Sequence, residues 1–439
     1  MWYNVIHHKT KIHKKEKIAM NHYIILGNRF KGDFVKFIRK ISKDFTKPIQ
    51  KFVADMTYGM IASNSCKLTE IGRALKENIE LKKTAERLGR NLAGFSQKEE
   101  LMKNYLPAVT HRLGKETMLL IDESDVIKPC SPDMEAIGTV YDASEGKFGR
   151  GYWTMGVAAL TDNKQQPVPV YEKLYPCKKQ GGLGSSAETK NALQFLRENF
   201  DNSIPRIFDR GFDSQNTIMD MAGNDEKFIL RANQNRTVVH NGRKTYIDDV
   251  VRGLVCGCEM TYRSKLGKNT KCQIGMTQVV LPRMKNLKLN LVVCKGYGKP
   301  LVLYTNLGET EETIALRVVK AYLMRWRIEE FYAFKKQRFH FEDFRVRSLA
   351  AIQTLDLLLT VAIGYLGLFC SEVDADSDVI ALIQMSKRTQ KIFDYIKTTK
   401  IYYHAILDGL TFLFALLSVG ISGLFAKKPV PNQLSLSFV

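Results

Sequence analysis

The sequence has few acidic residues for its size, and its cysteines form no recognisable framework. Asp and Glu number 45 against 66 Lys and Arg, which leaves a formal net charge of +21 and excludes an acidic, solvating chain. The eight cysteines are scattered, several within apolar runs, as is typical of reduced thiols in a cytosolic protein. Cys256, Cys258 and Cys272 lack the paired spacing of a zinc site, so we expect no structural zinc there.

The first residues lack any clear pattern. The stretch MWYNVIHHKTKIHKKEKIAMNH has no uninterrupted apolar core and does not resemble a secretory signal. We expect a loose basic arm, with Met20 as the natural start of the protein.

The sequence contains enough hydrophobic residues to form several cores. The 439 residues are 45% hydrophobic and 10% aromatic, which predicts two to four structural units. The excess of positive charge indicates a polyanionic partner, and nucleic acid is the commonest one for a large chain. An anionic membrane surface is the main alternative.

Two apolar runs near the end of the chain approach the length of a membrane span, at 351–370 and 409–425. Asp356 interrupts the first, and Asp408 precedes the second, which is short and contains several Gly and Ser residues. We therefore interpret both as buried helices of a C-terminal helical region, with membrane insertion as the alternative.

The first third of the chain has helical periodicity. Apolar residues recur from Phe34 to Phe45, and 68–92 is a second helical region rich in Lys and Arg. This predicts a small all-helical region. Its basic side chains either contact DNA or lie on ordinary solvated helix faces; they are Lys82, Lys83, Arg87 and Arg90.

From Met118 the pattern changes to short apolar runs that alternate with helical segments. Three strands followed by helix, strand, helix and strand predict a mixed α/β order. From 233 to 299 the sequence favours a β-rich insertion, in which Asn241-Gly242 is a strong hairpin signal. The predicted strands of the first part are 118–122, 151–160, 167–174, 206–209 and 227–232, and the helices are 187–200 and 214–222.

Two of these strands end in an acid, namely Asp122 and Asp209. If the two strands are parallel neighbours, both carboxylates emerge at the same edge of the sheet, where open α/β sheets bind ligands. Acids at strand ends also serve as caps or turn residues, so the two acids predict a ligand-binding site only together with a third polar group.

A third group is offered by the segment after the strand 300–307. We expect one helix from Thr310, a plausible N-cap, to Gln337, because no Gly or Pro interrupts it. At about 100° per residue, Tyr322, Arg325, Glu329 and Lys336 fall on one narrow stripe. An ordinary solvated face with an Arg325–Glu329 pair is the alternative, but large apolar residues flank the stripe and buried charges need partners.

Three carboxylates at a sheet edge, with cations beside them, are typical of Mg²⁺-dependent phosphoryl transfer. At these residues the chain resembles a family. Tyr322-x2-Arg325-x3-Glu329-x6-Lys336 looks like the YREK signature of the insertion-sequence-four family of DDE transposases. The stretches IDESDVIK at Ile121 and FDRGFDS at Phe208 resemble its two Asp motifs. The resemblance spans roughly 119–347, and the four-residue signature is more specific than either Asp motif.

The resemblance implies an RNase H-like α/β core with a β-rich insertion. It implies that Asp122, Asp209 and Glu329 bind two Mg²⁺ or Mn²⁺ ions. Phosphates at the transposon end would be gripped by Tyr322, Arg325 and Lys336, and Trp326 would stack on a flipped base. Arg210 and Arg231 are further candidates for DNA contact.

The implied activity is cleavage at a transposon end, hairpin formation and resolution in the excising members, and transfer of the freed 3′-hydroxyl to target DNA. The implied partners are inverted-repeat end DNA, target DNA and a second copy of the chain in a homodimer, with no membrane. The implied location is the nucleoid in a bacterial cytoplasm. Neither end-binding nor C-terminal signatures of the family are recognisable.

Alternatives remain open at this point. The chain could be an inactive or domesticated DNA-binding derivative, an RNase H-like nuclease without strand transfer, or a membrane-surface protein. Other acids could replace a member of the triad, although surface or pairing roles are favoured for them: Glu123, Asp125, Asp213, Glu330, Glu342 and Asp343. The predicted organisation is a basic helical region for DNA-end binding at 1–112, the core at 113–232 and 300–347, the insertion at 233–299, and an apolar helical region for dimerisation at 348–439.

Overall fold

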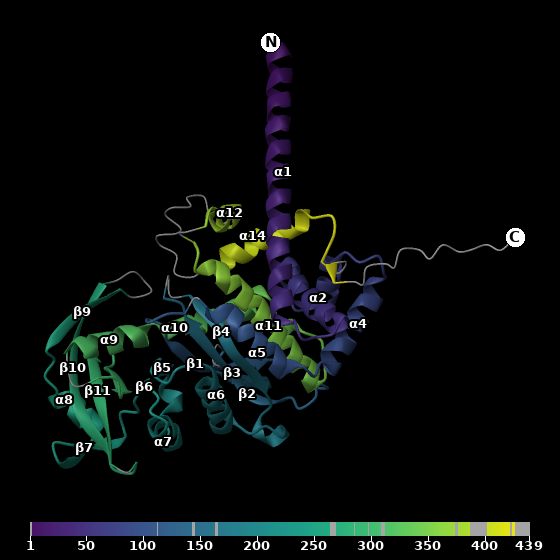
Figure 1. Ribbon diagram of the computed structural model, residues 1–439. Helices are drawn as coiled ribbons and strands as arrows, with labels where there is room; N and C mark the ends of the chain where they lie inside the picture. Colours follow the sequence, from purple (N-terminus) through teal and green to yellow (C-terminus); the bar gives the residue numbers. More distant parts are fainter. Residues whose placement is uncertain are drawn as a thin grey trace. The chain divides into compact units, whose positions relative to one another are not determined.

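The computed structural model describes residues 2–111, 113–142, 145–162, 166–263, 269–284, 286–296, 298–308, 312–373, 376–386, 402–421 and 424–425. The chain divides into two compact units (Figure 1). The helical unit comprises Met1–Arg112, Cys130–Glu135 and Phe334–Val439. The sheet unit comprises Leu113–Pro129 and Ala136–Ala333. The finer division into five segments stays a prediction.

The sheet unit is built on one large mixed sheet. Its order within the described residues is β2-β3-β1-β5-β6-β12-β11-β10-β7-β8, with β4 also paired to β3 and β9 to β10. The strands are β1 Leu119–Ile127, β2 Gly138–Asp142, β3 Lys147–Leu160, β4 Pro167–Tyr175, β5 Arg206–Phe208, β6 Phe228–Arg231, β7 Thr237–His240, β8 Arg243–Tyr246, β9 Cys258–Arg263, β10 Asn269–Leu281, β11 Leu287–Lys295 and β12 Leu301–Thr305.

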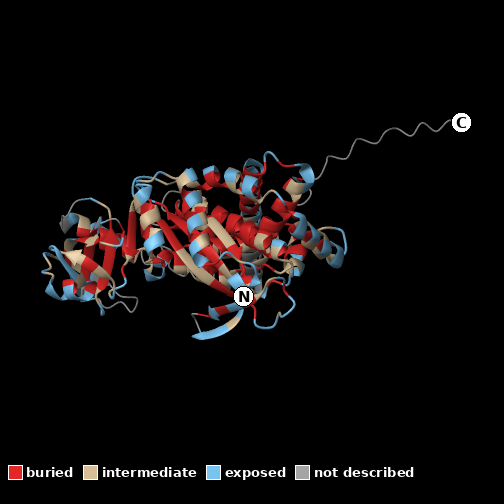
Figure 2. Cartoon of the chain, turned by 90° about the horizontal axis from the view of Figure 1, so that it is seen from below, coloured by how far each residue is buried: buried red, intermediate tan, exposed pale blue. Residues whose placement is uncertain are grey.

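The centre of this sheet is parallel. β1 pairs with β5 and β5 with β6 in parallel, whereas β3 is antiparallel to β1 and β12 is antiparallel to β6. Parallel strands are covered on both faces, so they read as continuous apolar runs. The residues of β5 are all buried, and Figure 2 shows in red the buried residues of the chain between exposed segments in pale blue. The predicted α/β class is confirmed, and the arrangement is consistent with an RNase H-like core.

Helices flank the sheet at the positions that the sequence predicts. α6 Ser185–Asn199 packs on β3, and α7 Gln215–Gly223 follows a cap in which Ser214 Oγ accepts a hydrogen bond from the backbone N–H of Thr217. Two strand predictions were incomplete. β2 lies between the predicted strands 118–122 and 151–160, where no strand was predicted, and β1 continues past Asp122 to Ile127 because it keeps pairing with β3.

The β-rich insertion holds β7 to β11 and one helix that was not predicted, α8 Ile247–Gly253. Asn241 and Gly242 both have positive φ, 49° and 74°, and join β7 to β8. Such a pair of left-handed residues is the favoured two-residue hairpin turn. The predicted hairpin is therefore confirmed.

The helical unit contains long and short helices packed around an apolar core. The predicted loose arm is wrong, since its residues belong to a 40-residue helix, α1. The region 68–92 is two helices rather than one, and the first is followed by Lys76 in the left-handed conformation. The helices are α1 Trp2–Ile41, α2 Lys47–Ser63, α3 Leu68–Leu75, α4 Leu81–Gly94, α5 Lys98–Thr110, α11 Leu349–Cys370, α12 Ser377–Met385 and α14 Tyr403–Leu416.

α11 is the one helix of the described residues that is long and apolar enough to cross a membrane, and 83% of its most apolar window is buried. Its acid, Asp356, forms an ion pair with Lys335, and both side chains are 2% exposed. Lys335 Nζ also lies 4.1 Å from the centre of the Phe341 ring. This packing fits the interpretation of α11 as a core helix.

The buried pair makes the helical unit sensitive to loss of one partner. Asp356→Ala should destabilise it by about 3–5 kcal/mol, because Lys335 is left charged and buried. Asp356→Leu combined with Lys335→Met should regain most of that loss. Thermal unfolding of the three proteins measures this, and a single variant as stable as the parent would contradict it.

Candidate active site

Two strands bring the predicted acids side by side. Ile121 of β1 is in register with Phe208 of the parallel strand β5, so Asp122 and Asp209 follow at adjacent positions of neighbouring strands. The predicted alignment at one edge is confirmed. Arg231 ends β6, the next parallel strand, one residue after Leu230, which pairs with Phe208.

The third acid comes from a pair of helices rather than from one. The predicted continuous helix is wrong, because α9 Glu312–Leu323 and α10 Trp326–Arg338 are separate. The N–H groups of Met324 and Arg325 bond to the carbonyls of Ala321 and Tyr322, three residues back, and this tighter turn breaks the α-helical ladder. Thr310, the predicted cap, lies outside the described residues. The break places Arg325 at the junction.

Arg325 links two of the acids. Its Nη1 lies 2.9 Å from Asp122 Oδ2, and its Nη2 lies 2.5 Å from Glu329 Oε1. The Arg325 side chain is 13% exposed, against 18% for Asp122 and 32% for Glu329. Charge-assisted hydrogen bonds of this kind are the strong ones, so one guanidinium holds a β1 acid and an α10 acid together.

Asp209 has a different set of partners. Tyr322 Oη donates to Asp209 Oδ1 at 2.8 Å, and Arg231 Nη1 lies 3.5 Å from the same oxygen. The side chain of Arg210 is exposed, but its backbone N–H bonds the Asp209 carboxylate. The Tyr322 phenol therefore reaches an acid directly, a contact that the sequence pattern did not reveal.

The two strand acids differ in proton affinity. Burial raises the pKa of Asp122 to about 7, against the opposing effect of Arg325. Burial also acts to raise the pKa of Asp209, but Arg325, the Arg210 N–H, Tyr322 and Arg231 together lower it below its ordinary value. Burial, followed by the charge of Asp209, raises the pKa of Tyr322, so this phenol stays protonated and donates. Carboxylates with diverging pKa values are a mark of functional sites.

Tyr332 and Gly156 were missed by the sequence analysis. Tyr332 Oη donates to the backbone carbonyl of Asp122 at 2.9 Å. Gly156 pairs with Asp122 across β1 and β3, and a Cβ atom there would lie 2.3 Å from Tyr332 Oη. The glycine thus makes room for the phenol that supports Asp122.

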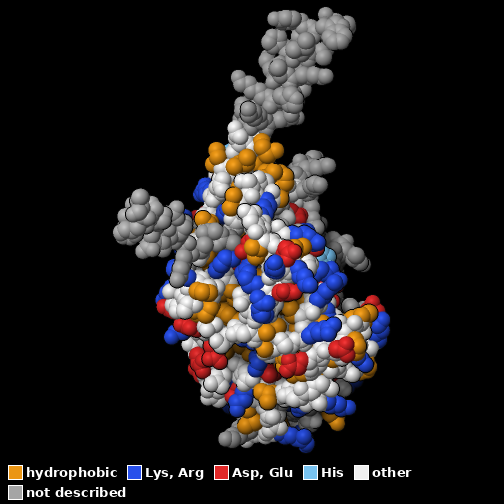
Figure 3. All heavy atoms as spheres, turned by 90° about the vertical axis from the view of Figure 1, so that its right-hand side faces the viewer, with side chains coloured by type: hydrophobic (Ala, Val, Ile, Leu, Met, Phe, Trp, Pro, Cys, Tyr) orange, Lys and Arg blue, Asp and Glu red, His pale blue; other side chains and the backbone are white. Residues whose placement is uncertain are grey.

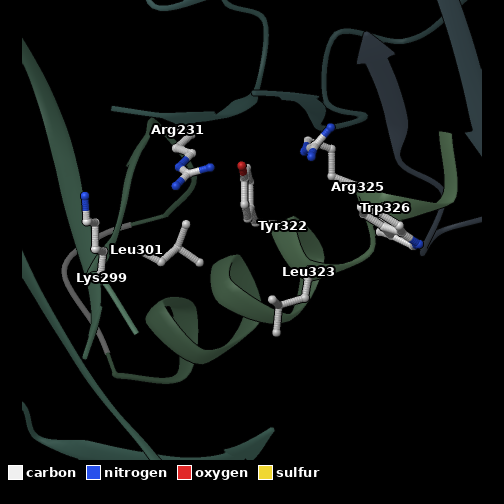
Figure 4. A pocket seen from close by; sticks show the side chains of 7 residues that line it. All are labelled: Arg231, Lys299, Leu301, Tyr322, Leu323, Arg325 and Trp326. Carbon is white, nitrogen blue, oxygen red and sulfur yellow. The ribbon is translucent and has the colours of Figure 1, made fainter. Parts of the chain in front are cut away.

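A pocket of about 250 Å³ adjoins this arrangement (Figure 4). It combines cationic, aromatic and aliphatic side chains, and Trp326 is 41% exposed. Lys299 was not predicted, since it stands alone in a Gly-containing loop. The lining residues are Arg231, Lys299, Leu301, Tyr322, Leu323, Arg325 and Trp326.

Lys336 is placed differently from the other members of the stripe. α10 enters the helical unit at Phe334, and Lys336 Nζ lies there 3.3 Å from Glu342 Oε1. The structure thus brings together Tyr322, Arg325 and Glu329 with the two strand acids, while Lys336 belongs to the other unit.

The competing acids have partners elsewhere. Glu123 follows Asp122, and strand alternation turns it to the opposite face, where Tyr175 and Ser185 donate to it. Asp213 bonds Arg236. The remaining acids also have partners, as the favoured interpretation predicts: Glu330 with Arg327, Glu342 with Lys336, and Asp343 with Lys67. Asp125 is not free either.

The donor set suits a divalent cation. Carboxylate oxygens are the ligands that Mg²⁺ prefers, and three of them come from β1, β5 and α10. Within the described residues, however, no three acidic, His or Cys side chains are already gathered as ligands, because cations and a phenol hold the carboxylates. The chemistry of these side chains fits the metal, and Arg325 bonds two of the three candidate ligands, Asp122 and Glu329.

Part of the chain is similar to a known family of domains. Residues 157–364 match a family model described as transposase DDE domain. The match includes Asp209 and Glu329, and it begins after Asp122. A cryo-EM structure of the piggyBac transposase synaptic complex with hairpin DNA is similar, with 10% identity and a TM-score of 0.44 over 94% of this chain and 77% of that chain. No curated protein matches the sequence.

The raised pKa of Asp122 has a consequence for stability. Between pH 3.8 and about 7 the folded chain keeps a proton that the unfolded chain has lost, so the contribution of Asp122 to stability falls as pH rises through this window. Asp122→Asn should therefore gain stability relative to the parent as pH rises from 4.5 to 8, by up to about 3 kcal/mol at about 1.4 kcal/mol per pKa unit. Urea unfolding followed by Trp fluorescence measures this.

Asp249→Asn is the control, because its partner Arg252 lowers the pKa of this exposed acid. Asp249→Asn should show no gain in stability relative to the parent as pH rises. A relative stability of Asp122→Asn that falls with pH would contradict the burial of this carboxyl group.

Gly156→Ala tests the support of Asp122 by Tyr332. The added methyl must displace the phenol, and overpacking of this kind costs about 1–3 kcal/mol. Gly149→Ala in the same strand is the matched control, since a Cβ atom added there would lie 3.7 Å from its nearest neighbour, Ile127 Cγ2. Thermal unfolding should separate the two variants, and equal stabilities would show that Tyr332 needs no such space.

Proposed function

We propose that this protein is a DNA transposase that cleaves strands at transposon ends and transfers them to target DNA. The observation that carries the proposal is the convergence of Asp122, Asp209 and Glu329 from β1, β5 and α10 around Arg325 and Tyr322. The transposase DDE domain matched by residues 157–364 supports the same class. Membership of the insertion-sequence-four family rests on the YREK-like spacing alone.

The three carboxylates would hold two Mg²⁺ ions, or Mn²⁺ in their place. When bound, the metal supplies activation of the attacking oxygen and stabilisation of the leaving oxygen in an in-line displacement. The protein itself would hold the DNA end: Arg231, Lys299 and Arg325 supply positive charge at the pocket, and the exposed ring of Trp326 offers a stacking surface for an unpaired base. Lys336, which belongs to the helical unit, would also bind a phosphate.

The surface supports a polyanionic partner. One face carries many Lys and Arg side chains with fewer acids between them (Figure 3). Of the basic residues predicted on α4, Arg87 is tied to Asp55 and Glu77, and Lys83 pairs with Glu80. Lys82 and Arg90 are exposed, so these two remain the candidates for DNA contact there. Phosphate contacts of this kind make binding salt-dependent.

Two related functions would differ from transposition in the DNA products that they give. An inactive, domesticated derivative would bind DNA without cutting it, and a nuclease would cut without joining. Intact acids at all three positions favour an active enzyme over the first. A homodimer on paired ends and a place at the bacterial nucleoid remain proposals, as does hairpin formation during excision.

The direct test uses duplex DNA that spans the boundaries of the element containing the gene. With Mn²⁺ or Mg²⁺ the full chain should nick one labelled strand at the boundary and join it to a plasmid. Asp122→Asn, Asp209→Asn and Glu329→Gln should each reduce nicking by more than roughly a hundredfold, since even outer partners of metal ligands cost up to that much.

Glu330→Gln is the matched control, because Glu330 neighbours Glu329 in sequence and pairs with Arg327. It should retain nicking within about threefold, as expected of a partly exposed ion pair. DNA binding by the three acid variants should persist in a filter assay. Full nicking by any of them would remove that residue from the site.

A further inference from the structure

The most unusual feature of the site is that its metal-binding candidates are occupied by the protein's own cation. Arg325 takes one oxygen of Asp122 and one of Glu329, and it neutralises charge that would otherwise be uncompensated in a half-buried place. Asp209 is held separately by Tyr322 and Arg231. No described residues form a ready cluster of ligands.

Arg325 also has a second binding opportunity. Its Nε is buried and bonds no acceptor among the described residues, and the residue lines the pocket together with Arg231 and Lys299. A guanidinium binds phosphate in the same two-pronged way as carboxylate. A phosphate in this pocket can therefore compete with Asp122 and Glu329 for the same donors.

We propose that Arg325 is an exchangeable latch: it holds Asp122 and Glu329 away from divalent metal in the free protein, and a DNA phosphate releases them by taking over its guanidinium. The inference rests on the proposed function, because it assumes that these acids are the ligands. Its consequence is coupling. Metal and DNA each raise the affinity for the other, as linkage requires, and the free chain is protected from cutting without an end in place.

The first experiment measures Mn²⁺ binding to the full chain without DNA, by the loss of the free-ion EPR signal. Arg325→Gln should bind Mn²⁺ at least about tenfold more tightly than the parent. A neighbouring opposite charge lowers the proton affinity of a carboxylate by roughly ten- to a thousandfold, and we expect its competition with Mn²⁺ to be of similar size. Arg231→Gln is the matched control. It removes an equal charge beside Asp209 but no bridge between acids, and should change the affinity by less than about threefold.

The second experiment adds a 20-nucleotide oligothymidine as a source of phosphates. The parent should gain affinity for Mn²⁺ with the oligonucleotide, and Arg325→Gln should gain none. The variant Asp122→Asn/Asp209→Asn/Glu329→Gln supplies the background of Mn²⁺ bound by oligonucleotide and by other parts of the chain, and each affinity is taken as the difference from it.

The outcomes separate the latch from the proposed function. Equal effects of Arg325→Gln and Arg231→Gln would overturn the latch in favour of plain electrostatics, and so would an unchanged affinity in Arg325→Gln or a parent that does not respond to oligothymidine. If the tighter binding of Arg325→Gln persists in the triple acid background, the acids are not the ligands, and the proposed function fails with the latch.

Discussion

The site depends on one guanidinium among three carboxylates. Asp122 and Glu329 are contributed by elements more than 200 residues apart in sequence, and Arg325 joins them at 2.9 and 2.5 Å. Without that charge, half-buried carboxylates would repel one another and take up protons. The same contact orients the start of α10 against β1. Folding of the sheet edge and assembly of the candidate active site therefore share one interaction.

Neighbouring contacts reinforce this centre. Tyr322 and Arg231 fix Asp209, and Tyr332 fixes the backbone of Asp122 through the space left by Gly156. The acid that follows Asp122 is turned away to Tyr175 and Ser185, so neighbours in sequence have separate roles on the two faces of β1. The pocket lined by Arg325 and Trp326 lies beside these contacts.

Periodicity in the sequence predicted much of this. Short apolar runs ending in acids predicted strands that would bring Asp122 and Asp209 to one edge if they were parallel neighbours, and surface or pairing roles were favoured for Glu123. The break between α9 and α10 was not predictable from composition, because no Gly or Pro marks Met324 or Arg325 and the turn is set by tertiary contacts of Arg325. Tyr332 and Gly156 were missed because their partners lie far away in sequence, and Lys299 was missed because it stands alone in a Gly-containing loop.

The account is tested most directly by anomalous X-ray diffraction from a crystal of the full chain bound to end DNA with Mn²⁺. It predicts Mn²⁺ density among the carboxylates of Asp122, Asp209 and Glu329, with the Arg325 guanidinium on a DNA phosphate. Mn²⁺ bound elsewhere, with Arg325 still bridging Asp122 and Glu329 beside a bound DNA end, would contradict it.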